Sequence, residues 1–174
     1  MLIYKFTFFV NLYIYYVYLY MFILEQSTGK KHLVVIEEVT GEDYKKITKP
    51  QYFFNWRTEK GNRVYKLRRT NDSKILGLIS LIKHEKEPWI RINLLAVSIE
   101  NRGKMKQYDR IGGTLIGFAC REAMRFFGKD ACVSLIPKTV LKKHYINKYD
   151  MQDAGEQIFL AGLPLLKNLN DYEL

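Results

Sequence analysis

The stretch from Leu94 to Phe127 reads LLAVSIENRGKMKQYDRIGGTLIGFACREAMRFF, and it predicts a strand, a basic loop and a helix in direct succession. An apolar run ends at Ser98. From Arg102 to Arg110 the loop that follows sets one acid, Asp109, against several cations, which are Arg102, Lys104, Lys106 and Arg110.

Glycines mark the start of this helix. Gly112 and Gly113 lie at its beginning, and four apolar positions at i, i+4 spacing make the helix amphipathic: Ile111, Leu115, Ala119 and Ala123. Unpaired N–H groups at a helix start, with glycines and flanking positive charge, form a site suited to a pyrophosphate. The segment therefore predicts a phosphate-bearing cofactor. The alternative is that the loop is basic only because the whole chain is.

The segment resembles the GNAT family of acyl-CoA N-acyltransferases, whose motif Q/R-x-x-G-x-G/A lies between a strand and a helix. In the preferred register Gln107 is first, Arg110 fourth and Gly112 sixth, and the sequence GTLI from Gly113 falls on the usual small-small-Leu-Leu stretch. The family has glycine where Arg110 stands. A second register has Arg110 first and Gly113 fourth, but it puts Leu115 where a small residue belongs.

The resemblance extends on both sides of the motif, over roughly residues 33 to 166. It implies an α/β (α+β) fold with a mixed central sheet, a splayed central strand pair and flanking helices. The segments that correspond are strands at Lys74–His84, Trp89–Ser98, Asp130–Pro137 and Gln157–Leu165, and a helix at Lys138–Met151.

The same resemblance implies acetyl-CoA or coenzyme A as cofactor, with no metal. Backbone groups of Leu95, Ala96 and Val97 would bind the pantetheine arm. The loop and helix start would hold the phosphates through Gln107, Arg110, Ile111, Gly112, Gly113 and Thr114.

The family commonly uses a tyrosine in the penultimate helix to protonate the leaving thiolate. Tyr145 matches that position best, although His144 or Tyr149 can occupy the same space because the segment is one residue longer here. A plain packing role on the sheet is the alternative for Tyr145.

A side-chain general base is harder to find. Many relatives have Glu in the strand before the cofactor-binding residues, where this chain has Arg91, Ile92 and Asn93. Glu85 and Glu87 are near in sequence but lie in an expected solvated turn. An amine of low pKa needs less help from a base, so the sequence leaves open a reaction without one.

Composition favours one domain of 174 residues, 48% of them apolar, with a net charge of +10 and a pI near 9.5. Such charge suits polyanionic partners, which include coenzyme A, nucleic acid or an acidic membrane surface. The two cysteines, Cys120 and Cys132, lack metal-ligand spacing and are expected to be reduced core residues of a cytoplasmic protein.

Residues 1–24 form a leader rich in tyrosine and phenylalanine, with Lys5 as its one charge. Three interpretations stay open: translated upstream sequence with the true start at Met21 or near it, a membrane anchor, or a packed extension. The N-acetyltransferase-like domain is then expected over residues 25–174.

The first half of that domain predicts strands at His32–Thr40 and Asn62–Asp72, with a helix starting at Gly41. An aromatic group follows Pro50: Tyr52, Phe53, Phe54 and Trp56. It either pins a loop to the core or, as in GNAT-like folds, helps to form the acceptor groove.

The resulting hypothesis is transfer of an acetyl group from acetyl-CoA to an amine of a small molecule or peptide, by a monomer or homodimer. The alternatives are a GNAT-type toxin that acetylates aminoacyl-tRNA, and a binding module without activity, tethered to a membrane only if residues 1–24 anchor it. P-loop and dinucleotide sites are excluded because neither GxxxxGK nor GxGxxG occurs.

Overall fold

The computed structural model describes residues 21–172 of the chain. The strands are β1 (Met21–Glu25), β2 (Lys31–Glu38), β3 (Arg63–Arg69), β4 (Gly77–Lys83), β5 (Trp89–Val97), β6 (Tyr108–Asp109), β7 (Cys132–Leu135), β8 (Gln152–Ala154) and β9 (Gln157–Ala161). The helices are α2 (Asp43–Lys46), α3 (Lys49–Tyr52), α4 (Ile111–Phe127), α5 (Thr139–Tyr149) and α6 (Gly162–Tyr172), with single 3-10 turns at Trp56–Glu59, Ile99–Asn101 and Gly128–Asp130.

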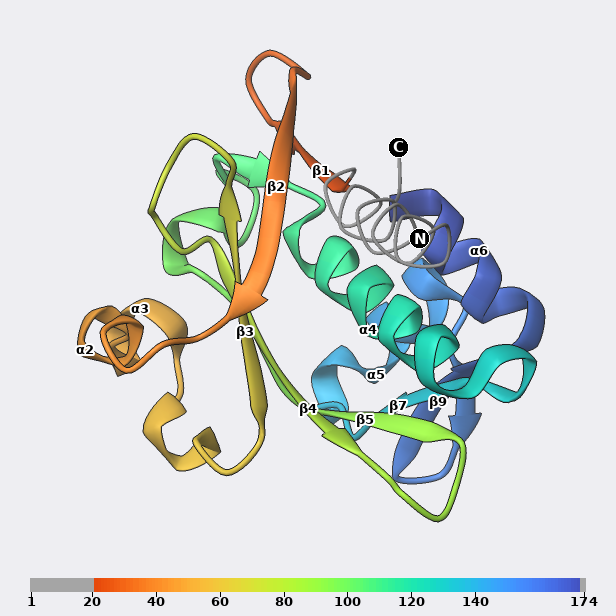
Figure 1. Ribbon diagram of the computed structural model, residues 1–174. Helices are drawn as coiled ribbons and strands as arrows, with labels where there is room; N and C mark the ends of the chain where they lie inside the picture. The colour runs from red at the N-terminus through yellow and green to blue at the C-terminus, as the bar shows by residue number, and fades with distance from the viewer. Residues whose placement is uncertain (1–20, 173–174) are drawn as a thin grey trace, which may run out of the picture.

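The strands form one mixed sheet in the order β6-β1-β2-β3-β4-β5-β7-β9-β8. Neighbouring strands are antiparallel except β5 and β7, which run parallel because α4 carries the chain between them. The sheet curls around α4, with α6 against the same helix (Figure 1). The predicted fold class, a mixed central sheet with flanking helices, is confirmed.

Burial of α4 follows its apolar spacing. Ile111 is 2% exposed, and Leu115, Ala119 and Ala123 are fully buried, so the predicted amphipathic helix is confirmed. Both cysteines are free; Cys120 is buried in this core, as expected, whereas Cys132 on β7 is only half-buried. The aromatic group divides: Tyr52 and Trp56 are buried, whereas Phe53 and Phe54 are half-buried and face a cavity.

The last predicted strand is too long. Strand β9 ends at Ala161, and the residues from Gly162 onward form α6. Gly162 has φ of +56°, which turns the chain, and Pro164 fits the first turn of a helix, where a missing N–H costs nothing. The apolar residues of this segment therefore contact the core from a helix, with Leu165 1% exposed.

Strand β1 contains residues that the sequence assigns to the leader. Met21, Phe22 and Ile23 are 2%, 7% and 0% exposed, and β1 pairs with both β2 and β6. The expected boundary after residue 24 thus falls inside a core strand, while residues 1–20 of the leader lie outside the described residues. Within residues 21–172, no helix is both long and apolar enough to cross a membrane.

Candidate active site

Strands β5 and β7 separate partway along their length. Their parallel pairing runs only from Trp89 with Cys132 to Ile92 with Leu135. Beyond this point β5 continues to Val97, whereas the chain after β7 turns away at Pro137, which has no N–H to continue the ladder. This edge of β5 therefore presents backbone groups that β7 does not pair.

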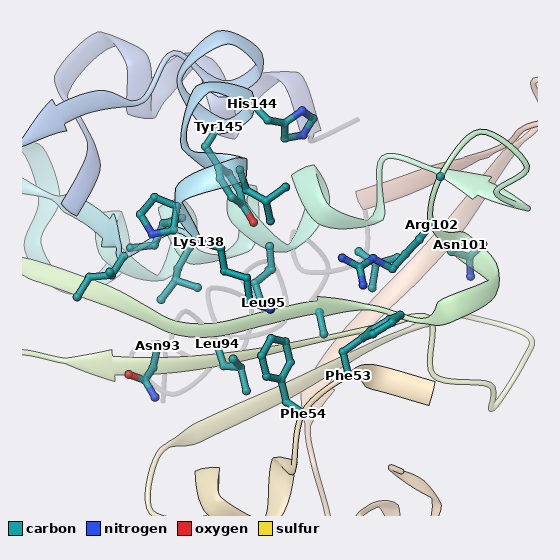
Figure 2. A pocket seen from close by; sticks show the side chains of 18 residues that line it. Phe53, Phe54, Asn93, Leu94, Leu95, Asn101, Arg102, Lys138, His144 and Tyr145 are labelled. Carbon is teal, nitrogen blue, oxygen red and sulfur yellow. The ribbon is translucent and has the colours of Figure 1, made fainter. Parts of the chain in front are cut away.

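A cavity of about 540 Å³ opens at this separation, between β5, α5 and the loop after α3 (Figure 2). It is lined by Phe53, Phe54, Ile92, Asn93, Leu94, Leu95, Ala96, Val97, Asn101, Arg102, Gly103, Leu135, Ile136, Pro137, Lys138, Leu141, His144 and Tyr145. The three strand residues predicted to bind the cofactor, Leu95, Ala96 and Val97, are among them.

A second cavity of about 310 Å³ continues from the first toward the start of α4. The two share a wall that includes Leu95, Arg102 and Tyr145. The other residues that line the second cavity include Lys106, Tyr108, Asp109, Arg110, Ile111, Gly112, Lys148 and Tyr149. We call the two cavities together the groove. It runs from the aromatic loop, past the free edge of β5, to a helix N-terminus.

The first N–H groups of α4 have no acceptor within the helix, as at any helix start. A side chain on Gly112 would point into the groove, since a Cβ there would lie 3.7 Å from the Tyr149 hydroxyl and 3.8 Å from Val97. Arg102, Lys106 and Lys148 line the walls, so the glycine, the free donors and the positive charge occur together.

Arg110 is the N-cap residue of α4 and has φ of +75°, in the left-handed region that favours glycine. The family motif has glycine at this position. This chain keeps the left-handed backbone conformation that glycine favours, although arginine stands there. The guanidinium stacks between the rings of Phe22 and Tyr172, 4.4 and 4.6 Å from their centroids, and donates to the Asp171 carbonyl. Part of its charge is therefore already engaged within the protein.

Three of the predicted cofactor residues lie away from the groove lining. Gln107 is exposed, and its backbone pairs with Gln26 and Glu100. A Cβ on Gly113 would meet the Tyr172 ring of α6, so only its backbone N–H is free to serve a ligand. The expectation for Thr114 is not supported, because its N–H donates to Arg110 at 2.8 Å and its hydroxyl to Phe22 at 3.3 Å.

Tyr145 stands where the two cavities meet, and its hydroxyl points into the groove in Figure 2, whereas His144 points outward. Burial raises the pKa of the Tyr145 hydroxyl, against the opposing effect of Arg102, and so keeps it protonated at neutral pH. Tyr149 is 5% exposed and packs among Tyr145 and Tyr172, which suits it to a structural position.

Carboxylates are scarce at this site. Among the described residues, Asp109 is the one acid that lines the groove, and it accepts from Lys106 and from the Arg110 N–H, both at 2.7 Å. Glu85 and Glu87 are in the turn before β5, outside the lining. A reaction without a side-chain base, which the sequence leaves open, stays a hypothesis.

Glu59 lies behind the groove at an irregularity in β5. Asn93 is the extra residue there, because Ser80 pairs with Leu94 while Leu81 pairs with Ile92. Glu59 Oε2 accepts from Ser80 at 2.6 Å, Asn93 at 2.9 Å and Asn62 at 3.0 Å. Burial raises the pKa of this carboxyl, but the three hydrogen bonds outweigh it and hold the pKa below the usual value. Such a carboxylate fixes the bulge and is a weak proton acceptor.

Sequence reasoning missed several lining residues. The sequence marks Arg102 only as part of a basic loop, yet this residue lines both cavities, and it gives no role to Lys138, which lines the larger one. Asn101 is buried and holds the loop by accepting from the Tyr108 N–H at 2.8 Å and donating to Ser98 at 2.9 Å. A polar residue at the end of a strand was the available signal for Asn101, and nothing local marked Lys138.

No family model matches the sequence, and no curated protein matches it either. Solved structures do. The spermidine/spermine N-acetyltransferase SpeG from Vibrio cholerae is 12% identical, with a TM-score of 0.57 over 80% of this chain and 98% of that one. The ribosomal-protein-S18-alanine N-acetyltransferase from Escherichia coli is 12% identical, with a TM-score of 0.53 over 75% and 97%.

A GNAT family acetyltransferase from Elizabethkingia anophelis, solved with acetyl-CoA bound, is 16% identical, with a TM-score of 0.52 over 70% of this chain and 78% of that one. At these identities the likeness concerns the fold. The chain therefore has the fold of the GNAT acyl-CoA N-acyltransferases, as its motif order predicts.

Proposed function

We propose that this protein is an N-acetyltransferase that moves an acetyl group from acetyl-CoA to an amine. The observation that carries the proposal is the continuous groove, because it joins an unpaired strand edge to a helix start with free N–H donors. Neighbours with this fold include one that holds acetyl-CoA. Fold alone does not establish function, so the proposal rests on the groove.

The groove residues fit the chemistry of this cofactor. Backbone groups of Leu95 and Val97 suit the amides of a pantetheine arm, and the N–H groups of Ile111, Gly112 and Gly113 suit a pyrophosphate. Arg102 and Lys148 add positive charge without a metal. When bound, acetyl-CoA supplies the activated thioester.

The protein's own contribution to the reaction lies in positioning and in one proton. Tyr145 is half-buried, protonated and directed into the groove, so we assign it as the donor that protonates the leaving thiolate. The amine is expected to enter in its neutral form, because the described lining offers no free carboxylate to deprotonate it.

The first test uses Gly112. Ala at this position fits, since its nearest contacts are at ordinary van der Waals distance, whereas Leu would fill the groove. We expect acetyl-CoA at about 100 times its dissociation constant to stabilise the wild type and Gly112→Ala by roughly 2.7 kcal/mol. Gly112→Leu should lose this thermal shift, and Gly41→Leu, at an open surface glycine, should keep it.

If neither acetyl-CoA nor CoA shifts the melting temperature of the wild type, the proposal is contradicted. The alternative, a binding module without activity, would then be favoured. Products are identified by mass spectrometry after incubation with acetyl-CoA and a panel of amines, peptides, polyamines and charged tRNA.

The second test uses Tyr145. Tyr145→Phe keeps the ring and removes the hydroxyl, so stability and acetyl-CoA affinity should hold while turnover falls about 100-fold or more. Tyr149→Phe and His144→Ala are the matched controls and should leave turnover near the wild-type value. Selective loss in either control would move the role to that residue, and unchanged turnover in all three would show that no side-chain acid operates here.

A further inference from the structure

The larger cavity, around Lys138 and Phe54, is the end of the groove away from the start of α4, and we call it the acceptor end. It is positively charged and has apolar walls. We infer that the acceptor is an amine carried on an apolar body together with an anionic group, a carboxylate or a phosphate, and that Lys138 recognises this group. The inference rests on the proposed function and adds the class of acceptor. It separates this protein from a polyamine acetyltransferase, whose substrates are cations throughout.

Charge is the first argument. Among the described residues, no Asp or Glu lines the larger cavity, whereas Arg102 and Lys138 both do. A polyamine with several positive charges would be repelled here, because nothing in the lining compensates it. An anionic group would be attracted.

Lys138 is the cation that the cofactor does not need. Arg102 lies where the two cavities meet and so faces the side suited to pyrophosphate, but Lys138 lines only the larger cavity. Its Nζ lies 5.1 Å from the centre of the Phe54 ring, and it has no ion pair to a described carboxylate. Lys138 is therefore a free point charge at the acceptor end, next to an aromatic face.

Apolar surface surrounds this charge. Phe53 and Phe54 project from the loop after α3 and line the cavity opposite α5, with Leu94 beside Phe54 (Figure 2). Ile136 also lines the cavity. Ile136 is 58% exposed, so this wall stays open to a ligand from outside. A ring or aliphatic chain would find contact area between the aromatic loop and α5.

Asn93 would accept a hydrogen bond from the amine of the acceptor. Because a carboxylate only accepts, the Asn93 amide nitrogen must face Glu59, at 2.9 Å, which leaves the amide oxygen as an acceptor for the incoming amine. Two neighbouring cations without a lining carboxylate also disfavour an ammonium ion. The site thus selects an amine that loses its proton easily, such as a peptide α-amine with a pKa of about 8.

The test compares probes that share one α-amine and differ in charge. Phenylalanyl-glycine is compared with phenylalanyl-glycinamide for a carboxylate, phenylalanyl-phosphoserinamide with phenylalanyl-serinamide for a phosphate, and spermidine represents the polycations. Binding to the CoA-saturated protein is measured by calorimetry, and transfer by kcat/KM with acetyl-CoA. We expect the anionic member of at least one pair to bind and react about fivefold better than its neutral partner, the scale of one exposed ion pair.

Lys138→Glu should reverse this preference, and Lys143→Glu is the matched control, since it makes the same charge change on α5 outside the lining. CoA binding should survive in both variants. Equal binding of charged and neutral partners, tighter binding of spermidine, or a preference that Lys138→Glu leaves intact would overturn the inference while the acyltransferase proposal stands. Loss of CoA binding by the wild type would instead remove the proposed function.

Discussion

Arg110 holds a conformation that its side chain disfavours. A non-glycine residue in the left-handed region costs about 1–2 kcal/mol, and here the cost is offset by stacking of the guanidinium between Phe22 and Tyr172. The arginine thus connects the N-terminus of α4 to β1 and α6. A glycine would adopt the same conformation without this cost but would make none of these contacts.

Comparison of two substitutions isolates the strain. Arg110→Ala and Arg110→Gly both lose the stacking, but only glycine relieves the backbone, so Arg110→Gly should be more stable by about 1 kcal/mol. Chemical denaturation measures the difference. At Arg102, where φ is −112°, the order should reverse, with Ala at least as stable as Gly. The same order at both sites would show that Arg110 is unstrained.

At the scale of elements, α4 and α6 meet through glycine. A Cβ on Gly113 would lie 2.0 Å from the Tyr172 ring, and one on Gly117 would lie 3.0 Å from the same residue. These glycines let α6 approach one side of α4 while Gly112 faces the groove on the other. The paired glycines of the motif therefore have different tasks.

A double-mutant cycle tests this contact. Gly113→Ala should destabilise the protein by about 1–2 kcal/mol, because overpacking exceeds the gain in helix propensity. In a Tyr172→Ala background the same change should be neutral or stabilising, since the ring is gone. Urea denaturation gives both values. If Gly113→Ala costs the same in the two backgrounds, Tyr172 is not what excludes a side chain at this position.

At the scale of the whole molecule, β1 connects β2 to the segment just before α4. It pairs with β2 on one side and β6 on the other, and its Phe22 carbonyl accepts from the Thr114 hydroxyl of α4 at 3.3 Å. The loop before α4 is thereby attached to the sheet through β6. Loss of β1 should affect both the stability of the core and the geometry of the cofactor end of the groove.

Truncation distinguishes this strand from the residues before it. A chain that begins at Gln26 loses three buried apolar side chains, which together contribute roughly 5 kcal/mol, a large part of the stability of a typical domain. We expect it to unfold at much lower temperature or to be insoluble, whereas a chain that begins at Met21 should keep its Tm and its acetyl-CoA shift. Circular dichroism on heating measures both. Equal Tm values would exclude β1 from the core.

The sequence by itself determined most of the helices and strands, because the spacing of apolar residues that specifies them lies within each short segment. The i, i+4 spacing from Ile111 to Ala123 predicted α4, and the apolar runs before and after it predicted β4, β5 and β7 within a few residues. The order of these elements sufficed for the fold class. Short strands such as β6, with two residues, carry too little pattern to be predicted and form only because β1 offers an edge.

Tertiary structure alone decided which residues share the groove. Phe54 in the loop after α3, Arg102 in the loop after β5 and Tyr145 in α5 come from three separate segments, and no spacing along the chain indicates that they meet. Likewise Gly113 and Thr114 fit the motif by their letters, but the helix turns them toward α6 and β1, since successive helical residues point about 100° apart. A motif specifies residue types in order, whereas a site depends on direction and on pairing between distant segments, which the folded chain alone supplies.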